Sequence, residues 1–260
     1  MGVLNITPDS FSDGGIYFDT SKAVLQATQL LSTGADVIDI GGQSTRPGAK
    51  YISSDLEIKR ILPAIKIIRK ENKNSLISVD TFNSRVAEKA LANGANWIND
   101  ISGGRIDDHI LNVVAEANCP FVINHSRGIS SNMNQFTQYK DVVSEVIDEL
   151  RSQTEIAISR GVLSKNIIWD PGIGFAKENH HNLEIIRNLE RFTNYKFPIM
   201  IGPSRKKFIG HYLNAKDPMD RLFGTIAVVC KCSQAKINIV RVHDVAEVTN
   251  VLSMSDLLFY

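Results

Sequence analysis

The sequence contains few cysteines, and their number is odd. Cys119, Cys230 and Cys232 are too few for a disulfide framework. Cys230 and Cys232 stand two positions apart in a segment with a helical pattern, so their side chains point to different faces and are not expected to share a metal ion. We therefore expect small buried thiols in a reducing compartment, which favours a cytoplasmic protein.

An excess of charge and long apolar runs are also missing. The chain has 29 Lys and Arg against 28 Asp and Glu, a net charge of +1, so no overall field attracts it to nucleic acid or to an anionic membrane. It has no uninterrupted apolar stretch of about 18 residues and no signal-peptide pattern. Its 43% hydrophobic and 22% charged residues are typical of a globular domain and exclude a mainly disordered chain.

Short apolar runs recur along the whole chain. Each run precedes a polar or glycine-rich loop and then an amphipathic helical pattern, as in parallel strands that are covered on both sides. The eight runs cover residues 2–5, 37–41, 76–80, 96–100, 121–125, 167–170, 198–202 and 237–243. We therefore predict an α/β fold, a single (β/α)8 TIM barrel spanning residues 1–260. A doubly wound open sheet is the alternative, but its GxGxxG signature is absent after the first run.

Each predicted strand ends in residues that can take part in chemistry. In a barrel these carboxyl ends converge on one face, where active sites are built. A helix cap or a turn explains any one such residue, but it does not explain four basic side chains on the same rim. The residues and segments at the eight ends are Asn5, 39–49, Asp80, 99–100, His125, 170–175, 202–208 and 241–244.

The types of side chain at these ends indicate what is bound. Short acidic and amide side chains suit the edge of a flat, amide-like heterocycle: Asp80, Asn99 and Asp170. Basic side chains beside glycine-rich backbone suit phosphate and carboxylate oxygens: Arg46, Lys206, Arg241 and His243. From the residues alone we expect a barrel enzyme that acts on a polar heterocycle carrying phosphate. His125 either lines this pocket or packs as a hydrogen-bonded core residue.

Seven segments carry a closer resemblance, in order and over essentially the whole chain. They are MGVLNITPDSFSDGG, DVIDIGGQSTRPGA, ISVDTF, WINDISGG, IIWDPGIGFAK, IGPSRKKFIG and VRVHDV. Together they resemble the dihydropteroate synthase family of folate biosynthesis. The resemblance implies a transferase that condenses 6-hydroxymethyl-7,8-dihydropterin diphosphate with 4-aminobenzoate, yielding 7,8-dihydropteroate and diphosphate. It also implies a target of sulfonamides.

The resemblance further implies roles for individual residues. The pterin-binding positions are Asp80, Asn99, Asp170, Lys206 and Phe175. The diphosphate-binding positions are Asn5, Thr45, Arg241 and His243, and Asn5 is also expected to bind a Mg2+ cofactor. The positions around 4-aminobenzoate are Arg46, Pro47, Phe175, Lys206, Ser204 and Phe11, with Asp13 on the same loop as Phe11. Those expected to be catalytic are Asp80, Lys206, Arg46 and Asp170.

Some positions differ from the sequence motifs that are usual in bacterial members of the family. Gln43, Pro203 and the segment INHSRG at 123–128 are more similar to fungal, plant and multifunctional forms. The chain also begins at its first predicted strand. We therefore expect a domain of a longer folate-synthesis polypeptide, fused to other domains of the pathway and mitochondrial if it derives from a fungal or plant protein. The family implies a homodimer that associates through the last helices.

Two other functions fit part of the pattern. A pterin-binding methyltransferase barrel shares the strand-end Asp and Asn, but has no use for the TPDSFSDGG and SRK segments. A catalytically inactive pterin-binding scaffold has no use for a diphosphate clamp. Adjacent His180 and His181 are expected to be solvated surface residues and not a metal pair.

Overall fold

The computed structural model describes residues 1–7, 16–44, 49 and 51–260, and its strands form a ring. Six consecutive parallel strands make one sheet: β1 (Gly2–Asn5), β2 (Val37–Gly41), β3 (Leu76–Asp80), β4 (Trp97–Asp100), β5 (Phe121–Asn124) and β6 (Ile167–Asp170). β7 (Met200–Ile201) and β8 (Ile239–Val240) pair as a second parallel sheet. The strand order follows the chain order, as a barrel requires.

Bridges at both edges join the two sheets into a closed barrel. Trp169 of β6 bridges to Ile199 ahead of β7, and Gly2 of β1 bridges to Val242 after β8. The backbone N–H of Val3 donates to the carbonyl of Val242 at 2.9 Å. The prediction of a (β/α)8 barrel is confirmed, and the open sheet is excluded.

The last two strands are shorter than the predicted runs 198–202 and 237–243. Pro198 has no backbone N–H to donate, and the N–H of Ile199 donates at 2.8 Å to the side-chain oxygen of Asn238 instead of to a strand. The regular ladder between β7 and β8 therefore begins only at Met200.

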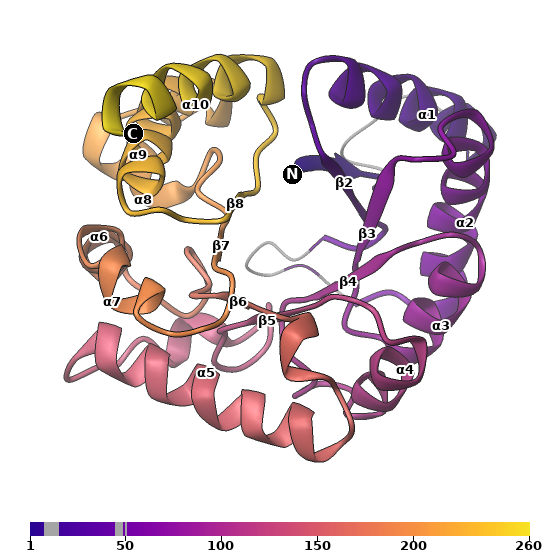
Figure 1. Ribbon diagram of the computed structural model, residues 1–260, viewed down its shortest axis with the longest axis horizontal. Coiled ribbons are helices and arrows are strands. Elements are labelled where there is room, and N and C mark those ends of the chain that lie inside the picture. Colours follow the sequence, from indigo (N-terminus) through magenta and orange to yellow (C-terminus); the bar gives the residue numbers. More distant parts are fainter. Residues whose placement is uncertain (8–15, 45–48, 50) are drawn as a thin grey trace.

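Helices surround the ring of strands, and the last of them completes the circuit beside the first (Figure 1). They are α1 (Ile16–Ser32), α2 (Ser54–Glu71), α3 (Ser84–Ala92), α4 (His109–Ala117), α5 (Val142–Ser159), α6 (Asn179–Arg187), α7 (Leu189–Thr193), α8 (Lys207–Leu213), α9 (Leu222–Gln234) and α10 (Val245–Phe259), with 3-10 turns η2 (Met133–Gln135), η3 (Ser164–Asn166) and η4 (Pro218–Arg221). In the part of the chain that is described, no helix is long and apolar enough to cross a membrane.

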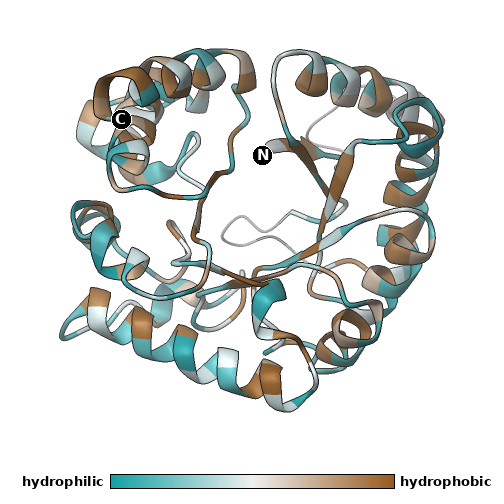
Figure 2. Ribbon diagram, viewed as in Figure 1, coloured by the Kyte–Doolittle hydropathy of each residue, from teal (hydrophilic) through white to brown (hydrophobic). Residues whose placement is uncertain are grey.

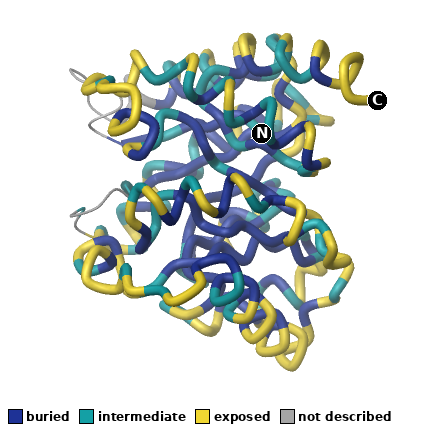
Figure 3. Tube along the Cα trace, turned by 90° about the vertical axis from the view of Figure 1, so that its left-hand side faces the viewer, coloured by how far each residue is buried: buried dark blue, intermediate teal, exposed yellow. Residues whose placement is uncertain are grey.

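The main hydrophobic core lies between the strands and the helices. Apolar residues gather on the strands and on the helix faces turned toward them, and the buried chain occupies the middle of the molecule (Figures 2 and 3). In α2 the helical period of the apolar residues places Ile61, Ile65 and Ile68 in this core. Asn83 caps α3, because its side chain accepts hydrogen bonds from the N–H groups of Arg85 and Val86.

A second, smaller apolar cluster fills one end of the barrel interior. It consists of Val122, Ile168 and Met200 packed with Met1, Trp97 and Ile239. Two positions further along four of these strands, the residues on the same inner face are polar: Asn99, Asn124, Asp170 and Arg241. The interior is therefore closed by apolar side chains at the amino ends of the strands and is polar toward their carboxyl ends. We call this polar lining the wall; it consists of Asp39, Asp80, Asn99, Asn124 and Asp170.

Candidate active site

Alternation along the short strands brings the polar side chains together inside the barrel. Asp80 pairs in register with Asn99 of the next strand, and Asn124 pairs with Asp170. All four side chains are buried. Three of them were predicted to form a pocket for a heterocycle, and the structure places these three on the same wall.

Arg241 compensates the negative charge of this wall. It follows β8, and it donates from Nε to Asp39 Oδ2 at 2.6 Å and from Nη2 to Asp80 Oδ2 at 2.8 Å. Burial raises the pKa of Asp80, while Arg241 opposes that shift. The net effect on Arg241 itself is a raised pKa, because the two carboxylates outweigh its burial. The guanidinium therefore stays charged and holds the ends of β2, β3 and β8 together.

Several buried oxygen atoms of the wall have no hydrogen-bond partner among the described residues. Asn99 donates from Nδ2 to Asp39 Oδ2 at 3.0 Å, which leaves Asn99 Oδ1 and Asp39 Oδ1 unpaired. Asn124 Oδ1 is likewise unpaired. Because an unpaired buried acceptor is costly, this arrangement indicates a ligand that presents N–H groups to the wall.

The ammonium of Lys206 lies over the ring of Phe175. Its Nζ lies 4.7 Å from the centroid of the Phe175 ring. Gly174 makes room for this approach, because a Cβ there would lie 3.1 Å from Lys206 Cδ. Burial lowers the pKa of Lys206 to about 8, against the opposing effect of Asp170. Lys206 thus remains mostly a cation near neutral pH, next to an aromatic face.

His243 and Ser204 form a hydrogen-bonded pair beside Arg241. The backbone N–H of His243 donates to Ser204 Oγ at 3.1 Å, and Ser204 Oγ lies 2.9 Å from His243 Nδ1. Burial and the nearby Arg241 lower the pKa of His243 to about 3, so the imidazole is neutral. If the Ser204 hydroxyl donates to Nδ1, the ring proton lies on Nε2, which can donate to an anion.

Asn5 stands at the carboxyl end of β1 and is only partly buried. A Cβ added to Gly41 would lie 3.4 Å from Asn5 Oδ1 and 3.8 Å from Asp80 Oδ2, so the two oxygens border one spot that glycine keeps open. No group of three or more His, Cys, Asp or Glu suited to a metal occurs among the residues described. A neutral amide oxygen near one carboxylate fits a Mg2+ ion that takes its other ligands from water and phosphate.

Some predicted site residues lie outside the described part of the chain. They are Phe11, Asp13, Thr45, Arg46 and Pro47. The other predicted residues are gathered on one face of the barrel.

The sequence analysis assigned no individual role to two residues of the wall, although Asp39 begins the segment 39–49. Asp39 lies two positions before the end of β2 and shares the inner face with Gly41, a signal that alternation alone could have supplied. Asn124 was missed because the fifth strand was predicted to end at His125. It ends at Asn124, and a shift of one residue exchanges the inward and outward faces.

His125 packs away from the pocket as a hydrogen-bonded core residue and is fully buried. The expectation of a solvated surface was wrong for His181. Its ring is buried against Tyr139, and its Nδ1 accepts the backbone N–H of Glu178 at the start of α6. A helix start that packs against a loop can bury one of two adjacent histidines while it exposes the other.

The barrel and its polar wall define a class of enzymes that bind a flat heterocycle at the carboxyl ends of the strands. A family model described as pterin binding enzyme matches residues 1–243. The chain is 44% identical to the dihydropteroate synthase of Bacillus subtilis, over 98% of this chain and 87% of that protein. It is 42% identical to a folic acid synthesis protein of Pneumocystis carinii, over 100% of this chain but only 36% of that longer protein.

A solved structure of similar shape is dihydropteroate synthase from Clostridium difficile in the presence of pteroic acid. Its TM-score is 0.94 at 39% identity, and the match covers 100% of this chain and 95% of that one. The chain therefore belongs to the dihydropteroate synthase family, whose members are transferases of folate synthesis. The methyltransferase alternative is set aside. Identity to the bacterial and fungal relatives is nearly equal, so it does not favour the fungal form.

The close packing of the loop after β6 at Gly172 can be tested by substitution with alanine. Its φ is +70°, and a Cβ there would lie 1.8 Å from the carbonyl oxygen of His125. Gly161 also has a positive φ, +96°, but a Cβ there meets only Ala115 at 3.5 Å. We expect Gly161→Ala to lower the free energy of unfolding by about 1–2 kcal/mol, the cost of the left-handed backbone, and Gly172→Ala to lower it further. Urea denaturation measures both, and equal losses would contradict this account.

Proposed function

We propose that this site joins the amine of 4-aminobenzoate to the exocyclic methylene carbon of 6-hydroxymethyl-7,8-dihydropterin diphosphate. A C–N bond forms, the C–O bond to diphosphate breaks, and the amine releases a proton. The observation that carries the proposal is the buried wall of unpaired oxygens between Arg241 and Lys206. Such a wall matches the amino and ring N–H groups of a pterin.

The pterin is held by both acceptors and donors. Asn99 Oδ1 is free to accept from the ring. Asp170 uses Oδ1 to accept the Gly172 N–H at 2.7 Å, so we infer that Oδ2 faces the ligand. Lys206 supplies donors for the ring carbonyl and nitrogen atoms.

The charged groups of the site can stabilise both the positive charge that develops on the pterin and the negative charge that develops on the leaving diphosphate. A reduced pterin is electron-rich and spreads positive charge that develops at the methylene carbon. We infer that Asp80 stabilises this charge, because its carboxylate is already fixed by Arg241 before any reaction. The remaining N–H groups of Arg241 and the Nε2–H of His243 take up charge on the diphosphate oxygens. The aminobenzoate amine is already nucleophilic, so the site needs no strong base.

We propose Asn5 as the protein ligand of a Mg2+ ion, on the basis of the open spot above Gly41. When bound, the ion would neutralise charge on the diphosphate. The fit of Asn5 rests on its neutral oxygen and partial exposure.

The proposed aminobenzoate side combines Ser204 and Phe175 with residues outside the described segments. We propose Phe11, Arg46 and Pro47 there, with Thr45 on the diphosphate. Sulfonamides, which resemble 4-aminobenzoate in shape, are expected to compete for this side. A cytoplasmic location remains a proposal, supported by three free cysteines. Fusion to other folate-synthesis domains is a proposal supported by the longer fungal relative.

The first test measures diphosphate release by the purified protein with the pterin diphosphate and Mg2+, with and without 4-aminobenzoate. We expect release that requires 4-aminobenzoate and yields dihydropteroate. Lys206→Ala and Asp80→Ala should each lower turnover by about 100-fold or more, since each removes a fixed charge of the site. Lys207→Ala is the matched control, because Lys207 is the exposed neighbour at the start of α8.

Thermal melts of these variants show whether the loss of turnover has another cause. Melting near the wild-type temperature places the residues in the chemistry, whereas unfolding would place them in the stability of the fold. Saturable pterin binding without product in the wild type would support the scaffold alternative.

We also propose a homodimer that associates through the last helices. α9 and α10 pack together and expose large apolar side chains, among them Phe223 at 80% and Leu257 at 82%. Phe223→Glu is expected to shift the protein to monomers, because it places a charge in the apolar face. Leu25→Glu, on α1 and 71% exposed, is the control that should leave the dimer intact. Light scattering after gel filtration measures the masses, and a wild-type monomer would refute the proposal.

A further inference from the structure

A buried lysine outside the pterin wall is surrounded by hydrogen-bond acceptors. Lys177 follows the loop after β6, and its Nζ contacts His125 Nδ1 at 2.9 Å, the carbonyl of Gly172 at 3.0 Å and that of Phe175 at 3.1 Å. An ammonium group has three N–H donors, and here each has an acceptor. Burial lowers the pKa of Lys177, but a neutral amine could serve only two of these acceptors as a donor.

The arrangement determines the tautomer of His125. Burial and the nearby Lys177 lower the pKa of His125 to about 3, so its ring is neutral. Since Nδ1 accepts from Lys177, the ring proton lies on Nε2, which is 3.0 Å from Glu149 Oε2. Burial alone would raise the pKa of Glu149, but hydrogen bonds from His125 and Arg127 lower it to about 2. A series of hydrogen bonds therefore runs from Lys177 through the neutral imidazole of His125 to the carboxylate of Glu149.

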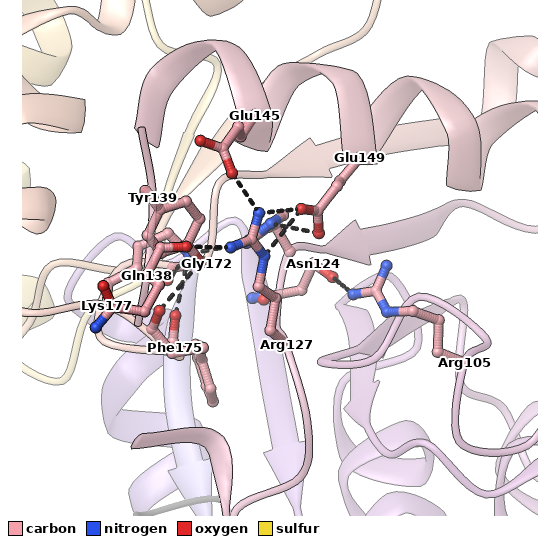
Figure 4. Close-up of polar contacts among 12 residues, drawn as sticks. Arg105, Asn124, Arg127, Gln138, Tyr139, Glu145, Glu149, Gly172, Phe175 and Lys177 are labelled. Carbon is pink, nitrogen blue, oxygen red and sulfur yellow. Dashed lines mark hydrogen bonds and ion pairs between the residues drawn. The ribbon is translucent and has the colours of Figure 1, made fainter. Parts of the chain in front are cut away.

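Helix α5 carries Glu149, the last residue in this series of hydrogen bonds (Figure 4). Glu145 and Glu149 stand one turn apart on α5 and both bind Arg127. Arg127 also donates to the carbonyl of Gln138 at 2.8 Å and lies 3.9 Å from the centroid of the Tyr139 ring. The network thus starts from a rigid helix and not from a loop.

A second path from the same anchor reaches the same loop. The hydroxyl of Tyr139 donates to the carbonyl of Ala176 at 3.0 Å. Ala176 has a φ of +48°, a left-handed conformation that a non-glycine residue rarely adopts. Two groups on the outer side of the loop, the ammonium of Lys177 and the hydroxyl of Tyr139, therefore hold three of its carbonyls: Gly172, Phe175 and Ala176.

The inner side of this loop carries residues of the proposed site. The N–H of Gly172 holds Asp170 Oδ1, and the ring of Phe175 lies against Lys206. Gly172 is thus held by Lys177 through its carbonyl while it orients Asp170 through its N–H. Lys177 donates its three hydrogen bonds to His125 and to this loop, and its charge also interacts with that of Asp170.

We propose that Lys177 is a positioning residue for pterin binding, which acts by fixing the loop 171–176 so that Asp170 and Phe175 face the ligand. Neutral His125 and the Tyr139 hydroxyl belong to the same support. The proposal rests on the proposed function, because it assigns the pterin to Asp170. If Lys177 served stability alone, its replacement would lower the free energy of unfolding but would leave the pterin affinity of the folded protein unchanged.

The test is a double-mutant cycle on pterin affinity. Calorimetry at pH 7 measures the Kd of 6-hydroxymethyl-7,8-dihydropterin diphosphate with Mg2+ for the wild type, Lys177→Met, Asp170→Asn and the double variant. We expect each single variant to weaken binding by about tenfold or more, and the double variant to bind within about threefold of Asp170→Asn. Lys165→Met, at an exposed lysine of η3, should bind like the wild type.

A second cycle separates position from charge and covers the case in which Lys177→Met fails to fold. Tyr139→Phe removes only the hydroxyl that holds Ala176 and changes no charge. We expect a weakening of about two- to fivefold that disappears in the Asp170→Asn background. Wild-type affinity in folded Lys177→Met, or effects that multiply with Asp170→Asn in both cycles, would overturn the proposal. Product formation by the wild type, assayed in parallel, reports separately on the proposed function.

Discussion

The ion pairs of Arg241 with Asp39 and Asp80 are the interaction on which the site depends. Two carboxylates on neighbouring strands inside a barrel would repel each other at high cost without a cation between them. Arg241 follows the last strand, so its ion pairs also tie β8 to β2 and β3. The same contacts fix the position of the Asp80 carboxylate, and the remaining guanidinium N–H groups can meet an anion.

The barrel divides its interior between stability and chemistry. Apolar residues close the amino ends of the strands, so the polar wall at the carboxyl ends does not have to support the fold. Unpaired oxygens such as Asn99 Oδ1 are tolerated there because the surrounding ladder fixes them. The loop after β6 needs separate support, which the network from α5 through His125 and Lys177 provides. The wall and the supporting network meet at Gly172, where the backbone passes too close to the carbonyl oxygen of His125 to leave room for a side chain.

Much of the fold and of the site could be predicted from the sequence, because both depend on local periodicity. Short apolar runs that alternate with helical patterns indicate a barrel, and the polar residues at the ends of those runs mark its active face. The prediction failed where one residue of register matters. The fifth strand ends at Asn124, which therefore faces the barrel interior, and His125 turns outward. The same alternation separates Asn99 on the wall from Asp100, whose carboxylate accepts the N–H groups of Ser102 and Gly104.

The sequence by itself determined the order of strands and helices, the polar strand ends and the family to which the chain belongs, because these depend on residue types at fixed spacing. Only the tertiary structure decided that the ring closes through the bridge between Gly2 and Val242, and that Arg241 lies between two carboxylates. It alone showed that Lys177 donates inward to three acceptors instead of snorkelling to solvent. These contacts join residues that lie far apart in the chain, or that depend on side-chain direction, and no local pattern encodes either of these.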